Sequence, residues 1–382
     1  NTVTLAPNTV NKTWIIQNSA GYQVTISQGT GANVVIPNGG IKMIVADGAG
    51  AGAAVTDVLD MTGGTGNIGL GSGSLGTAIT TGTDNVAIGE ASLDAVTSGT
   101  DNTAVGDNAG GALTTGADNT AIGSGAFLVA TTVSNHVAVG TNALAANTTG
   151  GRNTAIGKDA MLANTTGAHN VAVGEESFKA NTTGNYNTAL GRNSLVAATT
   201  ADDNVAVGNS SMVANTTGAS NTAVGKSSLY TNTTASNNTA VGYNSLYANT
   251  TGTDNVAVGS NALDANTTAS NNTAVGDNAL GANTTGAENV AVGADALDAC
   301  TTGSYNQAFG RGALGSLTTG DTNTAIGNAA MASLTTVSGN TAVGHSALTA
   351  NTTGDNNVAI GLNVMDANTT GASNTAVGAA AL

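Results

Sequence analysis

The sequence is poor in charged and aromatic residues, in proline and in cysteine. Charged residues make up 8% of the 382 residues and aromatic residues 3%, with 2 prolines and a single cysteine, Cys300. So few large side chains exclude a thick hydrophobic core. One cysteine excludes a disulfide framework, and no apolar run is long enough to span a bilayer.

Basic residues are especially scarce. Eight Lys and Arg stand against 23 Asp and Glu, which gives a net charge of −15. Binding to phosphates requires clustered Lys and Arg. We therefore expect no nucleic acid partner and no partner membrane with an anionic surface.

Glycine, alanine, threonine, asparagine and valine dominate the remainder. The chain contains 54 glycines, which favours disorder, but Val, Ile and Thr are also abundant, and disordered chains have few β-branched residues. The composition therefore predicts a thin core, a few side chains deep, that is repeated many times.

Three segments follow one another along the chain. Residues 1–60 are not repetitive and contain short β-type runs bounded by turn signals such as Pro37-Asn-Gly39, so we predict a small antiparallel β module. The predicted strands are 2–5, 13–17, 22–27, 33–36 and 41–45. Residues 61–84 form a Gly-rich junction with a degenerate first repeat at 67–71. Residues 85–382 form a single repeat array.

The array has a strict period of 17 residues. The motif Asn-(Thr/Val)-Ala-(Val/Ile)-Gly starts at Asn85 and recurs to Asn374 in 18 copies, with His136 as the one substitute for the first Asn. With that Asn as position 0, position 2 is always Ala, position 4 is always Gly and position 3 is always apolar. Representative residues are Asn85, Ala87, Gly89, Asn204, Ala206 and Gly208. A unit of this length is too short for a helical hairpin, so we predict an all-β fold: a parallel β-solenoid or β-roll with one rung per repeat.

The distribution of charge indicates which positions face water. Every charged residue from 85 onward falls at position 5, 6, 9, 15 or 16, so these five are predicted to be exposed and the others mostly not. Positions 2 and 3 lie on opposite faces of the strand, and neither carries charge. One face can fill the interior of the rung. The other requires a second surface, which predicts a parallel homo-oligomer, most simply a trimer.

Position 11 is Asn in most copies but Leu or Cys in others, such as Leu317 and Cys300. This exchange indicates a buried or half-buried corner where stacked Asn side chains form a hydrogen-bonded ladder. Many of these Asn residues begin an Asn-Thr-Thr sequon, and burial in a ladder would keep them from glycosylation.

The motif Asn-Thr-Ala-Val-Gly-x-x-Ala-Leu-x-Ala-Asn-Thr-Thr-Gly resembles the repeats of phage and bacterial tail-fibre proteins. It is also similar to the shorter head repeat of trimeric autotransporter adhesins, which implies a left-handed parallel β-roll. The resemblance covers residues 85–382, although the period of 17 is longer than that of the adhesins. Residues 34–38 and 46–50 resemble modules of marine phage tail fibres, which favours a viral fibre.

Two groups of side chains are candidate binding sites. Tyr230 and Tyr247 share position 9 of adjacent rungs and Tyr243 is nearby, so they could contact a receptor or glycan, or simply stack from rung to rung. Asp84, Asp101 and Asp118 share position 16 of successive rungs. They could bind a hard cation such as Ca²⁺, or they could be solvated surface carboxylates.

No set of residues predicts catalysis. His136, His169 and His345 lie in different rungs and at different repeat positions, so they do not form a catalytic set. Cys300 is interpreted as a small buried residue. We therefore expect no enzymatic activity and no cofactor. The Thr-Thr pair at positions 12 and 13 raises an ice-binding alternative, but adjacent residues of a strand point to opposite faces, so at most one Thr column would face out.

The sequence thus predicts the structural shaft of a virion tail fibre or spike that projects a receptor-binding tip. Its partners would be copies of itself, other virion tail proteins and, through a tip outside residues 1–382, a host receptor. The alternatives are a trimeric autotransporter-like adhesin on a bacterial cell surface and an ice-binding β-solenoid.

Overall fold

The computed structural model describes residues 1–36, 38–61, 66–76 and 78–381, and the described residues contain no α-helix. The chain divides into two units, residues 1–183 and residues 184–382. Parts of the predicted turn at 37–39 and of the predicted junction at 61–84, namely residues 37, 62–65 and 77, lie outside the described residues, as does residue 382.

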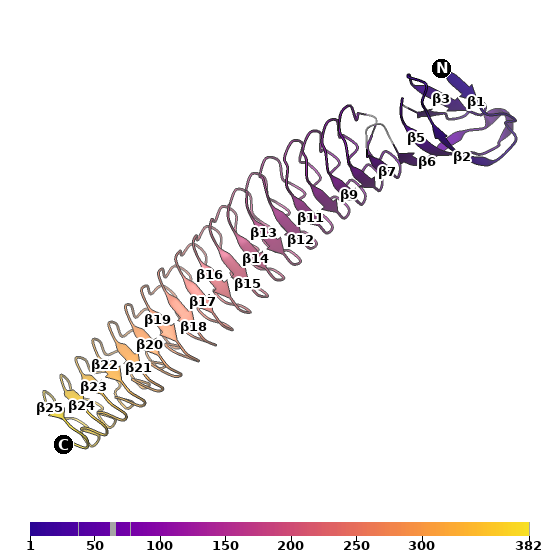
Figure 1. Ribbon diagram of the computed structural model, residues 1–382. Coiled ribbons are helices and arrows are strands. Elements are labelled where there is room, and N and C mark those ends of the chain that lie inside the picture. Colours follow the sequence, from indigo (N-terminus) through magenta and orange to yellow (C-terminus); the bar gives the residue numbers. More distant parts are fainter. Residues whose placement is uncertain (37, 62–65, 77, 382) are drawn as a thin grey trace. The chain divides into compact units, whose positions relative to one another are not determined.

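Unit 1 begins with a small β module (Figure 1). Its elements are β1 (Thr2–Thr4), β2 (Lys12–Gln17), β3 (Val24–Ser27), β4 (Val34–Ile36), β5 (Ile41–Ala46), the short 3₁₀ helix η1 (Gly50–Gly52) and β6 (Val55–Met61). The five predicted strands are all present. The sixth, β6, escaped prediction because its sequence contains two Asp residues, which are rare in strands.

The module packs around Ile26, Ile36, Ile44 and Val55, all buried. β2, β5 and β6 pair antiparallel, as predicted. β1 differs, because it pairs parallel with β3 in the register Val3↔Ile26, whereas β4 pairs antiparallel with β3.

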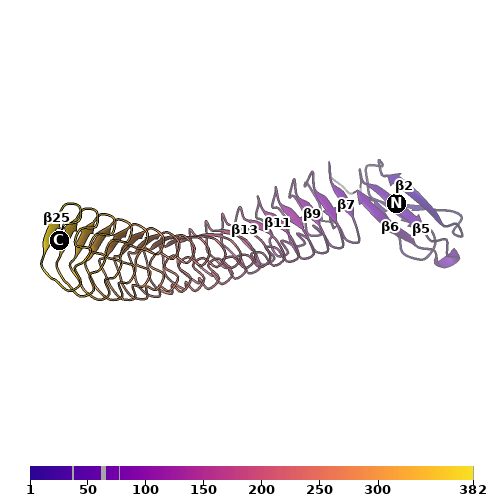
Figure 2. The same ribbon diagram turned by 90° about the horizontal axis from the view of Figure 1, so that it is seen from below.

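Short parallel strands, one per rung, form the solenoid in both units and confirm the predicted fold (Figures 1 and 2). In unit 1 they are β7 (Ile68–Leu70), β8 (Val86–Ile88), β9 (Thr103–Val105), β10 (Thr120–Ile122), β11 (Val137–Val139), β12 (Thr154–Ile156) and β13 (Val171–Val173). In unit 2 they are β14 (Thr188–Leu190), β15 (Val205–Val207), β16 (Thr222–Val224), β17 (Thr239–Val241), β18 (Val256–Val258), β19 (Thr273–Val275), β20 (Val290–Val292), β21 (Gln307–Phe309), β22 (Thr324–Ile326), β23 (Thr341–Val343), β24 (Val358–Ile360) and β25 (Thr375–Val377).

Equivalent positions pair from rung to rung. Ala206 is opposite Ala223 and Val207 opposite Val224, and the same register recurs along the ladder of unit 2. The degenerate first rung behaves in the same way, since β7 pairs parallel with β8 in the register Gly69↔Ala87.

Left-handed backbone at fixed positions lets a 17-residue segment close into a rung. Position 4 is always Gly because its φ is near +130° and the next rung is very close: a Cβ on Gly89 would lie 2.5 Å from the carbonyl oxygen of Gly106. Position 8 is also left-handed, although it carries a large side chain, as at Leu93 with φ 48°. Such a residue costs on the order of 1 kcal/mol, and full burial of the leucine offsets this cost.

The interior is filled by small side chains and one large side chain per rung. Ala206, Ser211 and Met212, at positions 2, 7 and 8 of one rung, are all fully buried. The interior is therefore thin, as the scarcity of aromatic residues predicted.

Asparagine at position 0 forms a ladder that sequence reasoning did not anticipate. Asn221 is fully buried. Its backbone N–H and its side-chain Nδ2 both donate to Oδ1 of Asn204, at 3.0 and 3.2 Å, and Nδ2 also donates to the carbonyl of Ala235 at 2.9 Å. Each such Asn connects two rungs and closes its own, so the buried amide is satisfied.

Asparagine at position 11 forms the second ladder, which confirms the prediction. In unit 2, Asn232 Nδ2 donates to Asn215 Oδ1 at 2.8 Å, and Asn249 Nδ2 donates to Asn232 Oδ1 at 3.1 Å. These residues are fully buried although each begins an Asn-Thr-Thr sequon. The hydroxyl of the following Thr at position 12 adds a third column, as where Thr216 Oγ1 donates to the carbonyl of Thr233.

Candidate functional site

The two faces of each strand are buried to very different extents. Positions 0 and 2, Asn and Ala, point into the rung and are buried, whereas positions 1 and 3 point outward. Alanine thus fills the interior, and the larger Val and Ile residues stay outside, 37% exposed at Ile88 and 43% at Ile326. The expectation that exposure is mostly confined to five charged positions was therefore too narrow.

We call the side chains at positions 1 and 3 of the rungs the strand face. In all 18 copies this face lacks charge, with Thr, Val or one Gln at position 1 and Val, Ile, Leu or Phe at position 3. The arrows that carry it lie side by side within each unit (Figure 1). With rungs about 4.8 Å apart and two columns roughly 10 Å wide, the strand face of unit 2 offers on the order of 600 Å². A standard protein interface buries about 800 Å² per partner.

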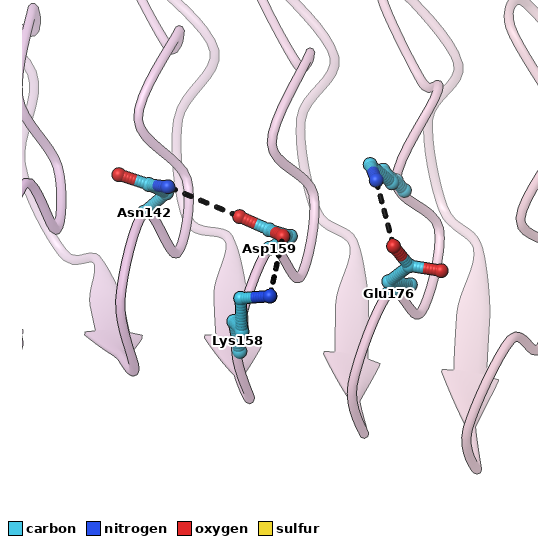
Figure 3. A network of polar contacts seen from close by, with 5 residues as sticks. Asn142, Lys158, Asp159 and Glu176 are labelled. Atoms are coloured by element: carbon cyan, nitrogen blue, oxygen red, sulfur yellow. Dashed lines mark hydrogen bonds and ion pairs between the residues drawn. The ribbon is translucent and has the colours of Figure 1, made fainter.

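Positions 5, 6 and 9 form a second surface, which we call the polar face. In unit 1, Asp159 accepts a hydrogen bond from Asn142 Nδ2 at 3.1 Å and pairs with Lys158 Nζ at 3.7 Å (Figure 3). Lys179 Nζ lies 2.8 Å from Glu176 Oε1, and this hydrogen bond lowers the pKa of the Glu176 carboxyl. The Lys179–Glu176 pair is partly exposed, and such surface pairs contribute little to stability.

The predicted tyrosine cluster lies on the polar face of unit 2. The rings of Tyr230 and Tyr247 are stacked, with centroids 5.0 Å apart and planes 11° apart. Tyr243 is exposed, and Lys226 Nζ lies 5.8 Å from its ring centroid. The facing surfaces of Tyr230 and Tyr247 cover each other, which is the rung-to-rung stacking alternative. Tyr243 keeps the more open ring.

The predicted aspartate column lies at the surface of unit 1. Asp84, Asp101 and Asp118 are exposed, and each adopts a left-handed backbone, with φ near 60°. Within the described part of the chain, no group of three or more His, Cys, Asp or Glu side chains is placed to hold a metal ion. The alternative of solvated surface carboxylates fits this arrangement.

Position 15, predicted only as a charged surface position, has a structural role. Where this residue is Ser or Asp, its side chain accepts a hydrogen bond from the backbone N–H of position 15 in the preceding rung. The Ala287 N–H donates to Ser304 Oγ at 3.1 Å, and the Ser304 N–H donates to Asp321 Oδ1 at 2.7 Å. The signal in the sequence was the recurrence of Ser and Asp, both short hydrogen-bond acceptors, at this position.

The Thr-Thr pair lies in a bend and not in a strand, so strand alternation does not apply to it, and both of its Thr residues are exposed in some rungs, as at Thr148 and Thr149. Position 13 is exposed, for example at Thr217 and Thr234. Position 12 is only partly buried, but its hydroxyl is engaged by the backbone of the next rung, as at Thr233 with Thr250.

The remaining chemistry-bearing groups do not converge. His136 is buried in unit 1, whereas His169 and His345 are exposed. Cys300 is buried, and burial raises the pKa of its thiol to about 11, so the thiol is protonated at neutral pH. A recess of about 430 Å³ beside Thr322, Val337 and Asp355 contains a single carboxylate, and Asp355 Oδ1 already accepts the backbone N–H of Ser338.

No protein-family model, curated protein or solved structure matches the chain. The described residues contain no helix long and apolar enough to cross a membrane.

Proposed function

We propose that the solenoid is the structural shaft of a viral tail fibre or spike, assembled from parallel copies that pack strand face against strand face, most simply three. The observation that carries this proposal is the strand face itself, which is charge-free in all 18 rungs, half-exposed and uninterrupted in period. Its apolar part is the column at position 3 together with the valines at position 1, since the other residues at position 1 are Thr and one Gln. Soluble monomers rarely leave apolar patches larger than a few hundred Å² uncovered.

The connections between rungs support a mechanical role. Two Asn ladders and a Thr column add side-chain hydrogen bonds to the backbone ladder, so each rung is held to its neighbours at several points. A shaft of this kind holds a receptor-binding tip away from the particle, and several tips on one particle gain avidity. Other virion tail proteins and a host receptor are the further partners that this role implies. A net charge of −15 argues against binding of nucleic acid or of an anionic membrane.

Self-association can be tested with two double variants that add the same charge to the same rungs. Val207→Lys with Val258→Lys places cations on the strand face, where both valines are at position 3. Asn209→Lys with Ser260→Lys places them at position 5 of the polar face, which carries Lys naturally at Lys158 and Lys226.

We expect light scattering after gel filtration to give an oligomeric mass for the wild type and for the polar-face variant. The strand-face variant should elute as a folded monomer, because charges would be buried without partners. A wild type that is monomeric at tens of micromolar, or a strand-face variant that keeps the oligomeric mass, would overturn the proposed assembly.

The place of the fibre is tested separately by immunogold electron microscopy. Antibodies to the solenoid should label projecting fibres of virus particles. Labelling of a bacterial envelope instead would favour the surface adhesin, and it would leave the assembly through the strand face unaffected.

A further inference from the structure

His136 interrupts the Asn ladder at position 0 in unit 1. Its backbone N–H donates to Asn119 Oδ1 at 3.1 Å, as an Asn would. Its imidazole takes the place of the Asn carboxamide oxygen, because Nδ1 accepts the backbone N–H of Asn153 at 3.1 Å. The side-chain bond that most other rungs make, as from Asn119 Nδ2 to Asn102 Oδ1, is missing between Asn153 and His136, where Asn153 Nδ2 donates to the carbonyl of Gly167.

The surroundings of this imidazole hold it neutral. His136 is 1% exposed, its Nε2 has no hydrogen-bond partner, and its ring lies 4.8 Å from that of Phe127. Phe127 itself occupies position 8, where most rungs carry Leu, so the two aromatic rings form a local exception in neighbouring rungs.

No charged group compensates for a proton on this ring. The rung before it, residues 119–135, contains no Asp, Glu, Lys or Arg. In its own rung and the next, the titratable side chains are Arg152, Lys158, Asp159 and His169, at the outward positions 16, 5 and 6. None of them shifts the pKa of His136. Burial, the largest effect, lowers this pKa from 6.5 to about 4 and outweighs the backbone contacts with Asn153 and Gly150, which raise it.

We propose that His136 is an acid-sensitive link between two rungs, residues 136–152 and residues 153–169. When Nδ1 takes up a proton from solvent, it becomes a donor and can no longer accept the hydrogen bond from the Asn153 N–H. The two rungs then separate. The backbone N–H and the new N–H would then face each other, and a charged ring would be buried beside Phe127. Both effects favour a locally opened state in which the imidazole reaches water.

The pH window follows from the two pKa values. The opened state takes up a proton below about 6.5 and the closed state only below about 4. Closure is therefore fully favourable above pH 6.5 and weakens as the pH falls to 4. Between pH 7 and pH 4 the equilibrium constant for opening should rise on the order of 100-fold.

Hydrogen exchange measured by mass spectrometry at pH 7, 5.5 and 4, corrected for intrinsic exchange rates, tests this link in the full chain. The wild type is compared with His136→Asn, which restores the residue of all other rungs, and with His169→Asn, which removes an exposed histidine at position 16. We expect protection of the peptides that contain β11 and β12 to fall by on the order of 100-fold between pH 7 and pH 4 in the wild type and in His169→Asn. In His136→Asn the peptides should lose no more protection than β9 does.

Equal losses of protection in the wild type and His136→Asn would overturn the proposal, because the acid effect would then come from the carboxylates. If His136→Asn folds poorly beside Phe127, the double variant Phe127→Leu with His136→Asn restores the usual residues at both positions and serves the same comparison. The inference does not depend on the proposed function of the shaft.

Discussion

Asparagine side chains connect the rungs in two separate columns, and in each column both ends of the carboxamide are used. Asn232 shows this fully. It donates through Nδ2 to Asn215 Oδ1 and to the carbonyl of Ala235, and its Oδ1 accepts from Asn249. A column that ends leaves one oxygen without a donor, as at Asn283 Oδ1, because the next residue at position 11 is Cys300.

Replacing one carboxamide by a carboxylate should therefore be costly. Asn232→Asp keeps the shape but replaces the donor by an anionic oxygen that faces two acceptor oxygens at about 3 Å. We expect a loss of about 3 kcal/mol in the free energy of unfolding, measured by urea denaturation.

Asn271→Asp is the matched control, because Asn271 is exposed at position 16, where Asp occurs naturally at Asp254. It should change the free energy of unfolding by no more than about 0.5 kcal/mol. Equal effects of the two substitutions would mean that the ladder does not hold the rungs together.

At the scale of the element, each rung is set by its turns more than by its three-residue strand. Gly310 and Gly315 lie in one rung, but only at Gly310 do a left-handed backbone and the close approach of the next rung require glycine. Gly310, at position 4, has φ 132°, and a Cβ there would lie 2.5 Å from the carbonyl oxygen of Gly327. A Cβ on Gly315 would meet its nearest atoms, Asp298 Oδ1 and the carbonyl oxygen of Gly312, at 3.3 Å.

We expect Gly310→Ala to destabilise the protein by more than about 2 kcal/mol, because it forces neighbouring backbones apart in a left-handed conformation. Gly315→Ala should be neutral or stabilising by up to about 1 kcal/mol. Thermal denaturation followed by circular dichroism distinguishes the two. A tolerated Gly310→Ala would show that rungs can shift to admit a side chain.

The period, the strand and the position-11 ladder could be predicted because they depend on one repeat compared with its neighbours. Which face of the strand points into the rung could not be predicted, because Ala at position 2 and Val at position 3 are both apolar. What decides it is the space between turns, which holds an Ala but not a second layer of Val beside the buried Leu of position 8. The ladder of Asn at position 0 could not be predicted either, because it depends on this side chain pointing into the rung, and a polar residue next to a turn is more often a turn or cap residue.

Of the candidate sites, the Tyr230–Tyr247 proximity followed from their shared position, since equal positions stack on successive rungs. The stacking of the aspartate column was predicted in the same way, but no group of three or more His, Cys, Asp or Glu side chains in the described residues is placed to hold a metal ion. Its backbone is left-handed at each residue, which a sequence pattern of Asp, Asn, Ser and Tyr at position 16 only indicates in retrospect.

At the scale of the whole molecule, the charge and the strand face act against each other. Each copy carries a net charge of −15, so association brings like charges together while it covers apolar side chains. Salt shortens the range of this repulsion from about 30 Å at 0.01 M to about 10 Å at 0.1 M.

Association should therefore strengthen with ionic strength. We expect sedimentation equilibrium to show a dissociation constant several-fold lower in 300 mM than in 20 mM sodium chloride, a difference on the order of 1 kcal/mol. Val207→Lys with Val258→Lys should remain monomeric at both salt concentrations. Weaker association at high salt would instead mean that ion pairs, not the strand face, hold the copies together.

The in-register pairing of equal positions also bears on how such a chain can change its length. Because Ala206 pairs with Ala223 and Asn204 with Asn221, removal of one whole repeat brings residues of the same kind back into contact. Removal of one residue more or fewer would set Asn against Thr or Ala in every column that crosses the junction. We therefore expect insertions and deletions to be tolerated as complete 17-residue units, so that homologous chains differ in length by multiples of that unit.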